Sequence, residues 1–116
     1  IRFPVWCRNK NNEYDLLIAV ANWPKVRVDA WNQLLIARAI ENEAYVCGVN
    51  CKGTDNNGFE YTGDSAAIDF KGKSINISND DSEVIYAVLD HEKLDAFRTK
   101  FPAWKDADSF QLTDNY

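Results

Sequence analysis

Three side chains early in the chain have the chemistry needed to bind a small polar molecule. Arg2 carries a guanidinium, which can hold a carboxylate through two parallel hydrogen bonds. Asn22 and Trp23 follow an apolar run, and they offer amide hydrogen bonds and a rigid indole wall that excludes water. Each has an ordinary alternative, because Arg2 could form a structural ion pair and Trp23 could pack in the core. These three are candidate binding residues, and their side-chain chemistry alone does not decide between the two roles.

The three cysteines are weaker candidates. Cys7 follows Arg2 and precedes a second arginine, and cations lower a thiol pKa, but a buried thiol is more often a small core residue. Cys47 and Cys51 lack both a second ligand pair for zinc and the Cys-x-x-Cys spacing of redox motifs. The single histidine, His91, is far from them in the sequence and is predicted to be a solvated helix residue. We predict core thiols and no metal site, and a thiol-redox protein is the least favoured hypothesis.

A strand and a helix must position the first group of residues. Leu16–Ala21 is a continuous apolar run, which predicts a strand covered on both faces and central in a sheet. Its end places the asparagine and the tryptophan where open α/β sheets hold their ligand-contacting loops. The helix predicted over Val28–Glu41 is apolar around much of its circumference, so a second layer or a second subunit should cover it. Arg38 and Glu41 on this helix could pair with each other or across an interface.

Shorter strands and one more helix are predicted in the second half. Ala44–Asn50 is a predicted strand, and Gly53–Gly58 is rich in Gly, Asn and Asp, which predicts a loop or hairpin. Asp90 is the predicted N-cap of a helix that ends at Pro102. The other predicted strands are Ser65–Phe70 and Ser74–Ser78, paired as a hairpin across Lys71–Lys73, and Glu83–Leu89, which follows a polar turn at Asn79–Ser82.

Composition narrows the function classes. The chain has 116 residues, 46% of them hydrophobic, which is enough apolar material for the core of one domain. Its net charge of -5 and lack of a basic cluster argue against a nucleic-acid partner. No apolar run approaches the roughly 20 residues that span a bilayer, so no membrane contact is predicted. An odd number of cysteines favours a reducing cytoplasm over a disulfide framework.

Several short segments, in order, resemble the carbon-nitrogen hydrolase (nitrilase) family, and most closely its omega-amidase-like branch. The segments are Ile1-Arg2-Phe3-Pro4, Asn22-Trp23-Pro24, Ala37-Arg38-Ala39-Ile40-Glu41-Asn42, Gly53-Thr54-Asp55, Tyr61-Thr62-Gly63-Asp64-Ser65 and Phe101-Pro102-Ala103-Trp104-Lys105-Asp106-Ala107-Asp108. The similarity runs nearly end to end.

The resemblance implies an α/β fold, the C-terminal part of a four-layer αββα sandwich spanning residues 1–116. Family members use a Cys nucleophile, a Glu base and an oxyanion-holding Lys, and all three would precede Ile1, the cysteine by three positions. No catalytic residue is therefore expected within the chain, and the isolated chain should be inactive. The resemblance also implies no cofactor, and a homodimer that uses the predicted helix and the segment Phe3–Arg8.

The leading hypothesis is a fragment of an amidohydrolase that cleaves a short omega-amide, such as a 2-oxo-dicarboxylate monoamide, through a Cys thioester. Arg2 would face the acidic end of this small-molecule substrate, and Asn22 and Trp23 would line the acyl pocket. The alternative is a non-catalytic interaction module that binds a partner through its apolar helix. Half of a sandwich should expose a large apolar sheet face, which normally requires association.

Overall fold

The computed structural model describes residues 1–77 and 83–113. Its core is a parallel strand pair joined by a helix, in which β1 (Leu16–Ala21) leads through α1 (Val28–Asn42) into β2 (Tyr45–Asn50). The other elements are the 3-10 helices η1 (Pro4–Cys7), η2 (Lys25–Arg27) and η3 (Ala103–Asp106), the strands β3 (Lys52–Thr54), β4 (Glu60–Thr62) and β5 (Ala66–Ile68), and the helix α2 (His91–Lys100).

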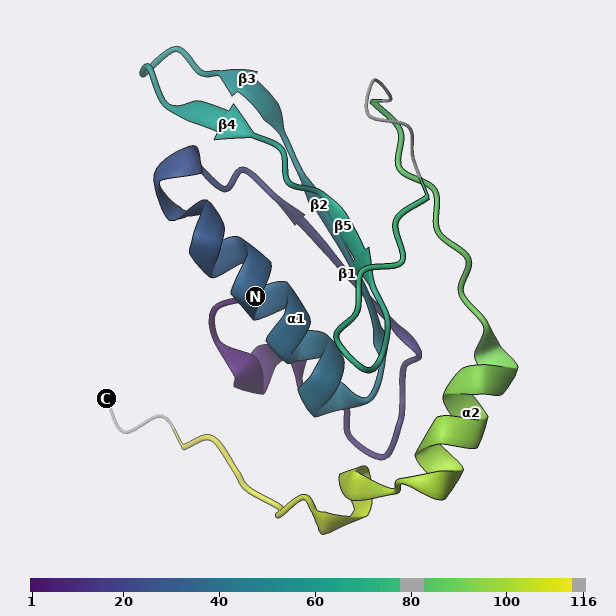
Figure 1. The fold of residues 1–116 in the computed structure, drawn as a ribbon. Coiled ribbons are helices and arrows are strands. Elements are labelled where there is room, and N and C mark those ends of the chain that lie inside the picture. The colour runs from purple at the N-terminus through teal and green to yellow at the C-terminus, as the bar shows by residue number, and fades with distance from the viewer. Residues whose placement is uncertain (78–82, 114–116) are drawn as a thin grey trace.

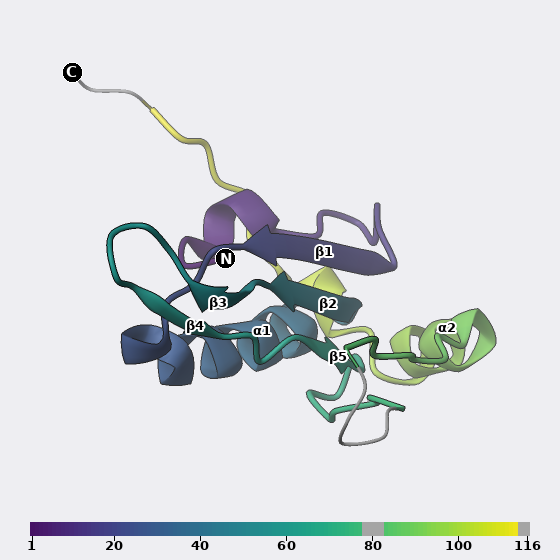
Figure 2. The ribbon, with the colours of Figure 1, turned by 90° about the horizontal axis from the view of Figure 1, so that it is seen from above.

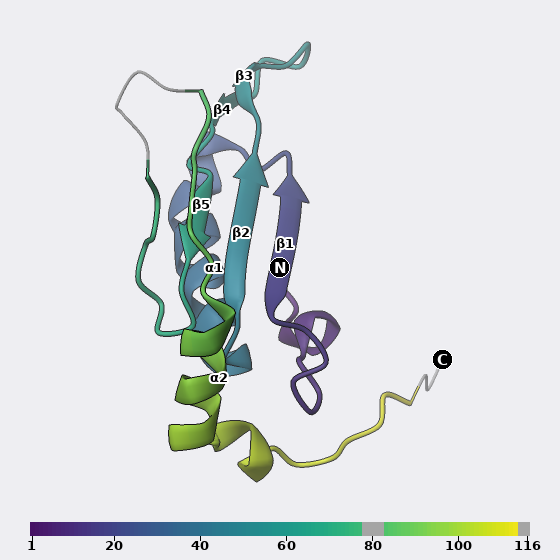
Figure 3. The same cartoon turned by 90° about the vertical axis from the view of Figure 1, so that its right-hand side faces the viewer.

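The three-stranded sheet has the order β1-β2-β5, with β5 antiparallel to β2 (Figures 1 and 3). The predicted strand Leu16–Ala21 is therefore real, but the prediction that it is central is wrong within the described residues. It pairs with β2 on one side, and β2 is the central strand. An apolar run predicts that a strand is buried, but it does not determine how many neighbouring strands pair with it.

One face of the sheet packs against α1, which lies along it (Figure 2). The core between them contains Trp31, Leu35 and Ala39 from the helix and Val46 and Ile68 from the strands. The helix approaches β2 closely at Gly48, where an added Cβ would lie 2.5 Å from Leu35 Cδ1. Only glycine fits there, because real Cβ atoms do not come this close to a neighbour, so Gly48 sets the spacing between helix and sheet.

The opposite face of the sheet is apolar and open to solvent. Ile18 and Val20 on β1 are 60% and 80% exposed, and Val49 on β2 is 48% exposed. Alternate residues of a strand point to opposite faces, so these side chains lie across the sheet from α1. The prediction that the strand is covered on both faces is wrong within the described residues, while the exposed apolar face expected of half a sandwich is confirmed.

The dimensions of the chain also indicate an open arrangement. Its Cα radius of gyration is 15.9 Å and its extents are 45 × 45 × 18 Å. A compact domain of this length has a radius of gyration of about 13 Å.

A second apolar cluster joins α2 to the amino ends of β1 and β2 and to the segment that follows β5. Leu94 is fully buried against Tyr45 and Phe70, with Phe97 beside them. The predicted N-cap is confirmed, because the Asp90 side chain accepts a hydrogen bond from Lys93 N at 3.0 Å. That hydrogen bond also holds the pKa of the Asp90 carboxyl below its ordinary value.

Both predicted hairpins are present in part. β3 and β4 pair antiparallel around the Gly-rich loop. After β5 the chain turns at Lys71–Lys73, and Ser74 forms a single bridge with Ile68 instead of a second strand. Ser78 and the turn predicted at 79–82 lie outside the described residues. Glu83–Leu89 is not a strand, and its one bridge pairs Tyr86 with Ile77.

α1 is buried on one side and partly exposed on the other. Ile40 is 52% exposed, although Gly72 of the turn packs beside it. Arg38 and Glu41 form an ion pair with each other at 2.9 Å, which was one of the two predicted pairings. Arg38 Nε also donates to Ile1 O at 2.8 Å. No helix within the described residues is long and apolar enough to cross a membrane.

Candidate functional site

Trp23 lies just beyond the carboxyl end of β1. Its indole Nε1 donates to Arg27 O at 2.6 Å, and its ring centroid is 5.7 Å from that of Trp31 in the core. The ring is half-buried, so it packs on the core and still presents a surface to the chain's start. The core and pocket interpretations of this tryptophan are thus compatible.

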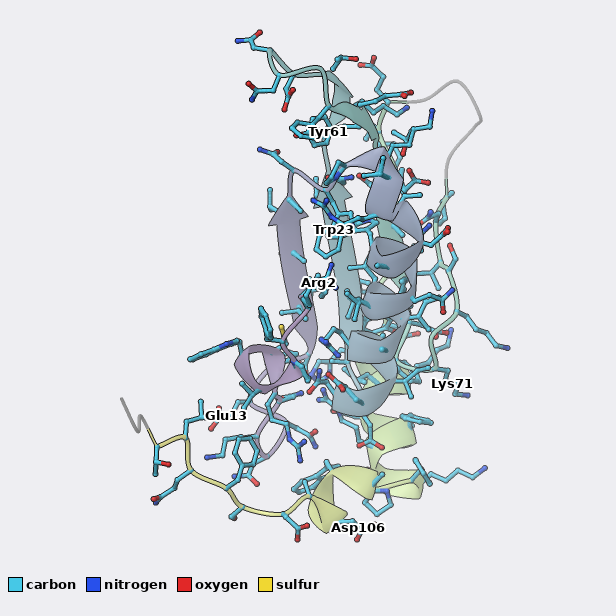
Figure 4. All side chains as sticks on the ribbon, turned by 90° about the vertical axis from the view of Figure 1, so that its left-hand side faces the viewer. Arg2, Glu13, Trp23, Tyr61, Lys71 and Asp106 are labelled. Atoms are coloured by element: carbon cyan, nitrogen blue, oxygen red, sulfur yellow. The ribbon has the colours of Figure 1, made fainter. Side chains whose placement is uncertain are left out.

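Arg2 packs on that surface. Its Cζ atom is 5.1 Å from the Trp23 ring centroid, and Figure 4 shows the two side chains together between β1 and α1. A guanidinium over an indole face is attracted by the ring quadrupole, an interaction of about 0.5–1 kcal/mol at an exposed site. Arg2 is exposed, and within the described residues no carboxylate pairs with it. Its donors therefore face solvent beside an apolar wall.

Asn22 is the third predicted site residue, and it does not join this pair by a hydrogen bond. The side chain is exposed, and within residues 1–77 and 83–113 its amide has no hydrogen-bond partner. The structure thus brings Arg2 and Trp23 together, and Asn22 precedes Trp23 in the sequence without a side-chain hydrogen bond to either residue.

Asn50, at the last position of β2, escaped the sequence analysis. It is 8% exposed, and its Oδ1 accepts from Trp23 N at 2.7 Å. Its Nδ2 donates to Trp23 O at 2.9 Å and to Gly63 O at 2.8 Å. Ser65 holds its backbone, since Asn50 N donates to Ser65 Oγ at 2.9 Å. The sequence gives no local signal for this residue, because its partners Trp23 and Gly63 are distant along the chain.

The β3–β4 hairpin extends beyond the carboxyl ends of β1 and β2 (Figures 1 and 4). Asp55 organises its loop, with Oδ1 accepting from Phe59 N and Oδ2 accepting from Tyr61 Oη, each at 2.9 Å. The Phe59 N–H holds the pKa of the Asp55 carboxyl below its ordinary value, and the bond to Asp55 raises the pKa of Tyr61. Lys25 and Glu60 tie the hairpin to η2 at 3.0 Å.

The three cysteines lie outside both apolar core clusters, so the prediction that they are core thiols is not borne out. Cys7, Cys47 and Cys51 are free and half-buried. Burial raises the pKa of the Cys47 thiol, which lowers its thiolate fraction and its reactivity. Within the described residues no group of His, Cys, Asp and Glu could hold a metal ion.

The family is decided by residues 1–99, which match the family model described as carbon-nitrogen hydrolase. The chain belongs to the carbon-nitrogen hydrolase family. This confirms the resemblance predicted from the sequence segments, and it agrees with the α/β fold.

Curated relatives of this carbon-nitrogen hydrolase chain include omega-amidases. It is 50% identical over 113 residues to Omega-amidase YafV of Escherichia coli (strain K12), covering 97% of this chain and 44% of that protein. It is 35% identical over 107 residues to 2-oxoglutaramate amidase of Bacillus subtilis (strain 168), covering 91% of this chain and 41% of that protein. The chain thus spans less than half the length of these relatives, and the predicted likeness to the omega-amidase branch is confirmed.

Solved structures agree with the fold. A CN-hydrolase superfamily protein from Xanthomonas campestris, which carries an arsenic adduct in its active site, is 42% identical, with a TM-score of 0.86 over 97% of this chain and 45% of that one. Nit3 of Saccharomyces cerevisiae, a member of branch 10 of the nitrilase superfamily, is 26% identical, with a TM-score of 0.73 over 87% of this chain and 38% of that one.

Proposed function

We propose that this chain is the C-terminal portion of an amidase that hydrolyses a short omega-amide, such as a 2-oxo-dicarboxylate monoamide. Arg2 binds the carboxylate at the end of the substrate away from the amide. Trp23 forms a wall of the acyl pocket, and Asn22 supplies amide hydrogen bonds at its rim. The catalytic Cys, Glu and Lys lie in residues that precede Ile1, and no cofactor takes part.

The observation that carries this proposal is the exposed Arg2 guanidinium held on the Trp23 ring at 5.1 Å. A cation with free donors beside an apolar wall suits a substrate that has a carboxylate at one end of a short carbon chain. The pair lies near the carboxyl ends of two parallel strands, where α/β folds commonly place ligands. The names of the relatives, omega-amidase and 2-oxoglutaramate amidase, describe amides of this kind.

The reaction follows the scheme implied by the family. The Cys thiolate attacks the amide carbon, and Lys stabilises the resulting oxyanion. The C–N bond then breaks as the Glu gives the nitrogen the proton that it took from the Cys thiol, so ammonia leaves and a thioester remains. The Glu removes a proton from water, which attacks the thioester and releases the acid and the thiol. Arg2 contributes by fixing the distance between the bound carboxylate and the reacting carbon.

The open sheet face supports the proposal that a second sheet completes a four-layer sandwich. Ile18, Val20 and Val49 form an apolar surface that a monomeric soluble protein rarely leaves uncovered. We further propose a cytoplasmic homodimer in which η1 and the outer side of α1 contact the partner copy. Trp6 on η1 is 76% exposed and Ile40 on α1 is 52% exposed, which supports this choice of surface.

The test uses the longer protein that contains this chain, with a 2-oxo-dicarboxylate monoamide and the methyl ester of its carboxylate as substrates. Arg2→Gln should lower kcat/KM for the acid by about 30-fold and leave the ester nearly unchanged, because a charge-assisted hydrogen bond is worth about 1.5–3 kcal/mol.

Arg8→Gln is the matched control, since Arg8 is also exposed and also packs on an aromatic ring, that of Phe110 at 5.8 Å. Its activity on the acid should match that of the unmodified protein. A longer protein that hydrolyses neither amide would refute the proposed function, and equal losses on both substrates in Arg2→Gln would refute the role of Arg2.

The second candidate is a non-catalytic module that binds another protein, and the same exposed sheet face favours it. This candidate predicts a saturable complex between the chain and a partner, without amide hydrolysis in any longer form. Sedimentation of the longer protein separates the two proposals, because an amidase with its sandwich complete needs no foreign partner to stay monodisperse.

A further inference from the structure

We propose that Asn50 is a positioning residue for the acidic end of the substrate, acting through Trp23 on Arg2. This inference rests on the proposed function for its substrate, and on the hydrogen bonds of Asn50 for its mechanism. Asn50 touches neither the substrate nor the reacting atoms in this scheme. Its effect is to hold the ring on which the carboxylate-binding guanidinium rests.

The side-chain amide of Asn50 grips both backbone polar groups of Trp23. Oδ1 accepts from Trp23 N at 2.7 Å, and Nδ2 donates to Trp23 O at 2.9 Å. This fixes the position of the Trp23 Cα atom against the end of β2, 27 residues further along the chain. The indole is then held at its far end by Arg27 O at 2.6 Å. Held at the backbone and at the ring, Trp23 has little freedom to move.

The same amide reaches a third segment. Nδ2 also donates to Gly63 O at 2.8 Å, at the point where the chain leaves the β3–β4 hairpin. Asn50 thus joins the end of β2, the residue after β1 and the base of the hairpin. Being 8% exposed, the amide makes these bonds away from water, where an unsatisfied donor or acceptor costs about 1–3 kcal/mol.

The orientation of the amide determines which substitution is informative. Two of its three bonds are donated by Nδ2 to carbonyl oxygens. Asn50→Asp has nearly the same shape but replaces that donor with an oxygen, so it faces the carbonyls of Trp23 and Gly63 without a proton. We expect the Trp23 backbone to move away, carrying with it the ring under Arg2.

The first readout is substrate selectivity in the longer protein. Asn50→Asp should lower kcat/KM for the acid relative to its methyl ester by about tenfold, because displacing a substrate-positioning group by an ångström can cost that much or more. The ester, which does not use Arg2, should change far less. Equal losses on both substrates would mean a purely structural role and would overturn the proposal.

Asn9→Asp is the matched control. Asn9 is also 8% exposed, and its Nδ2 likewise donates to two carbonyls, those of Tyr14 at 2.8 Å and Asn42 at 3.2 Å. It lies away from the Arg2 and Trp23 pair, at the other end of the sheet. Its substitution should lower stability and leave the acid-to-ester ratio unchanged, and a ratio that falls as much as in Asn50→Asp would overturn the proposal.

Ser65→Ala is a milder second variant in case Asn50→Asp does not fold. Ser65 Oγ accepts from Asn50 N at 2.9 Å and donates to Asn50 O at 3.3 Å, so its loss loosens the Asn50 backbone. We expect the same selectivity change, by about two- to threefold. An unchanged ratio in a folded Ser65→Ala protein, together with an unfolded Asn50→Asp protein, would overturn the proposal.

The second readout needs no activity, so it stands even if the proposed function fails. Proteins are labelled with 5-fluorotryptophan, and the Trp23 fluorine resonance is assigned with Trp23→Phe. Asn50→Asp should shift or broaden the Trp23 resonance and leave the Trp104 resonance unchanged. Arg2→Gln should also shift the Trp23 resonance. A Trp23 resonance that is unaffected by Asn50→Asp would overturn the proposal, whatever the assays show.

Discussion

Both ends of the three-stranded sheet are tied by a buried asparagine, but the two ends use their arginines in opposite ways. At the amino end, Asn9 binds the backbone of Tyr14 before β1 and of Asn42 at the end of α1. At the carboxyl end, Asn50 binds the backbone of Trp23 after β1 and of Gly63. Each amide links segments that the backbone hydrogen bonds between the strands do not connect.

The arginine at the amino end is enclosed by the protein. Arg98 on α2 is 6% exposed, and it donates to Glu43 O at 2.9 Å, to Tyr14 O at 2.9 Å and to Asp15 Oδ1 at 2.5 Å. Burial raises the pKa of the neighbouring Tyr14 to about 12, so its hydroxyl stays protonated and donates to Cys7 O. The Arg98 guanidinium therefore donates its hydrogen bonds to acceptors within the chain, and its role is structural.

Arg2 at the carboxyl end packs on one ring and keeps its donors toward solvent. The difference teaches that the same two residue types can serve stability or recognition, according to whether the cation is surrounded by acceptors. Under the proposed function, mutations at the amino end should act on folding and mutations at the carboxyl end should act on substrate selectivity.

The largest expected effect is at the amino end. Arg98→Ala should lower the free energy of unfolding by about 3 kcal/mol, since it leaves buried acceptors unpaired. Urea unfolding measures this, with Lys100→Ala on the exposed side of the same helix as control. The acid-to-ester selectivity of the folded fraction should not change. A stability loss below about 0.5 kcal/mol would erase the contrast between the two ends.

Glu43 offers a smaller effect of opposite sign. It is 4% exposed, and within the described residues neither of its carboxylate oxygens accepts a hydrogen bond. Burial raises its pKa despite the nearby N–H groups of Ala103 and Trp104. A raised pKa means that stability is highest when the carboxyl is protonated and falls as pH rises through the folded pKa. Glu43→Gln should therefore stabilise the protein at neutral pH by about 1 kcal/mol.

The pH dependence sharpens this prediction. The gain from Glu43→Gln should be small below the ordinary carboxyl pKa and should grow as pH rises toward neutral. Thermal unfolding of both proteins from acid to neutral pH measures it, with Glu13→Gln as the exposed control. A gain that is the same at every pH would show that charge burial is not its cause.

The smallest expected effect concerns the ion pair that ties the hairpin to η2. Lys25 and Glu60 are 53% and 56% exposed at the side chain, so Lys25→Ala should cost only about 0.3 kcal/mol, and less at high salt. A double-mutant cycle with Glu60→Ala measures the coupling. A coupling above about 1 kcal/mol would mean that charge also holds the carboxyl end, and the comparison would need revision.

Local patterns predicted most of the elements. The apolar run gave β1, the Gly-rich segment gave the β3–β4 hairpin, and Asp90 capped α2 as expected. Position in the sheet was not predictable in this way, because an apolar run does not say which of its faces is covered. β1 is accordingly at the edge of the described sheet, with Ile18 and Val20 exposed.

Arg2 and Trp23 could be selected as candidates from the sequence, but the residues that hold them in place could not. The chemistry of Arg2 and Trp23 singled them out, but their contact depends on how the chain's start returns to β1. Asn50 and Glu43 could not be found from the sequence, since a lone amide or carboxylate gains its meaning from partners that are distant along the chain. Long-range hydrogen bonding leaves no local pattern.

The uncovered sheet face has a consequence for the life of the chain in a cell. A row of aliphatic side chains on paired strands, here Ile18, Val20 and Val49, resembles the surface that chaperones and quality-control proteases recognise in unfinished proteins. We expect the chain by itself to be bound and degraded quickly, and to persist only once another sheet has covered this face. Abundance would then report assembly.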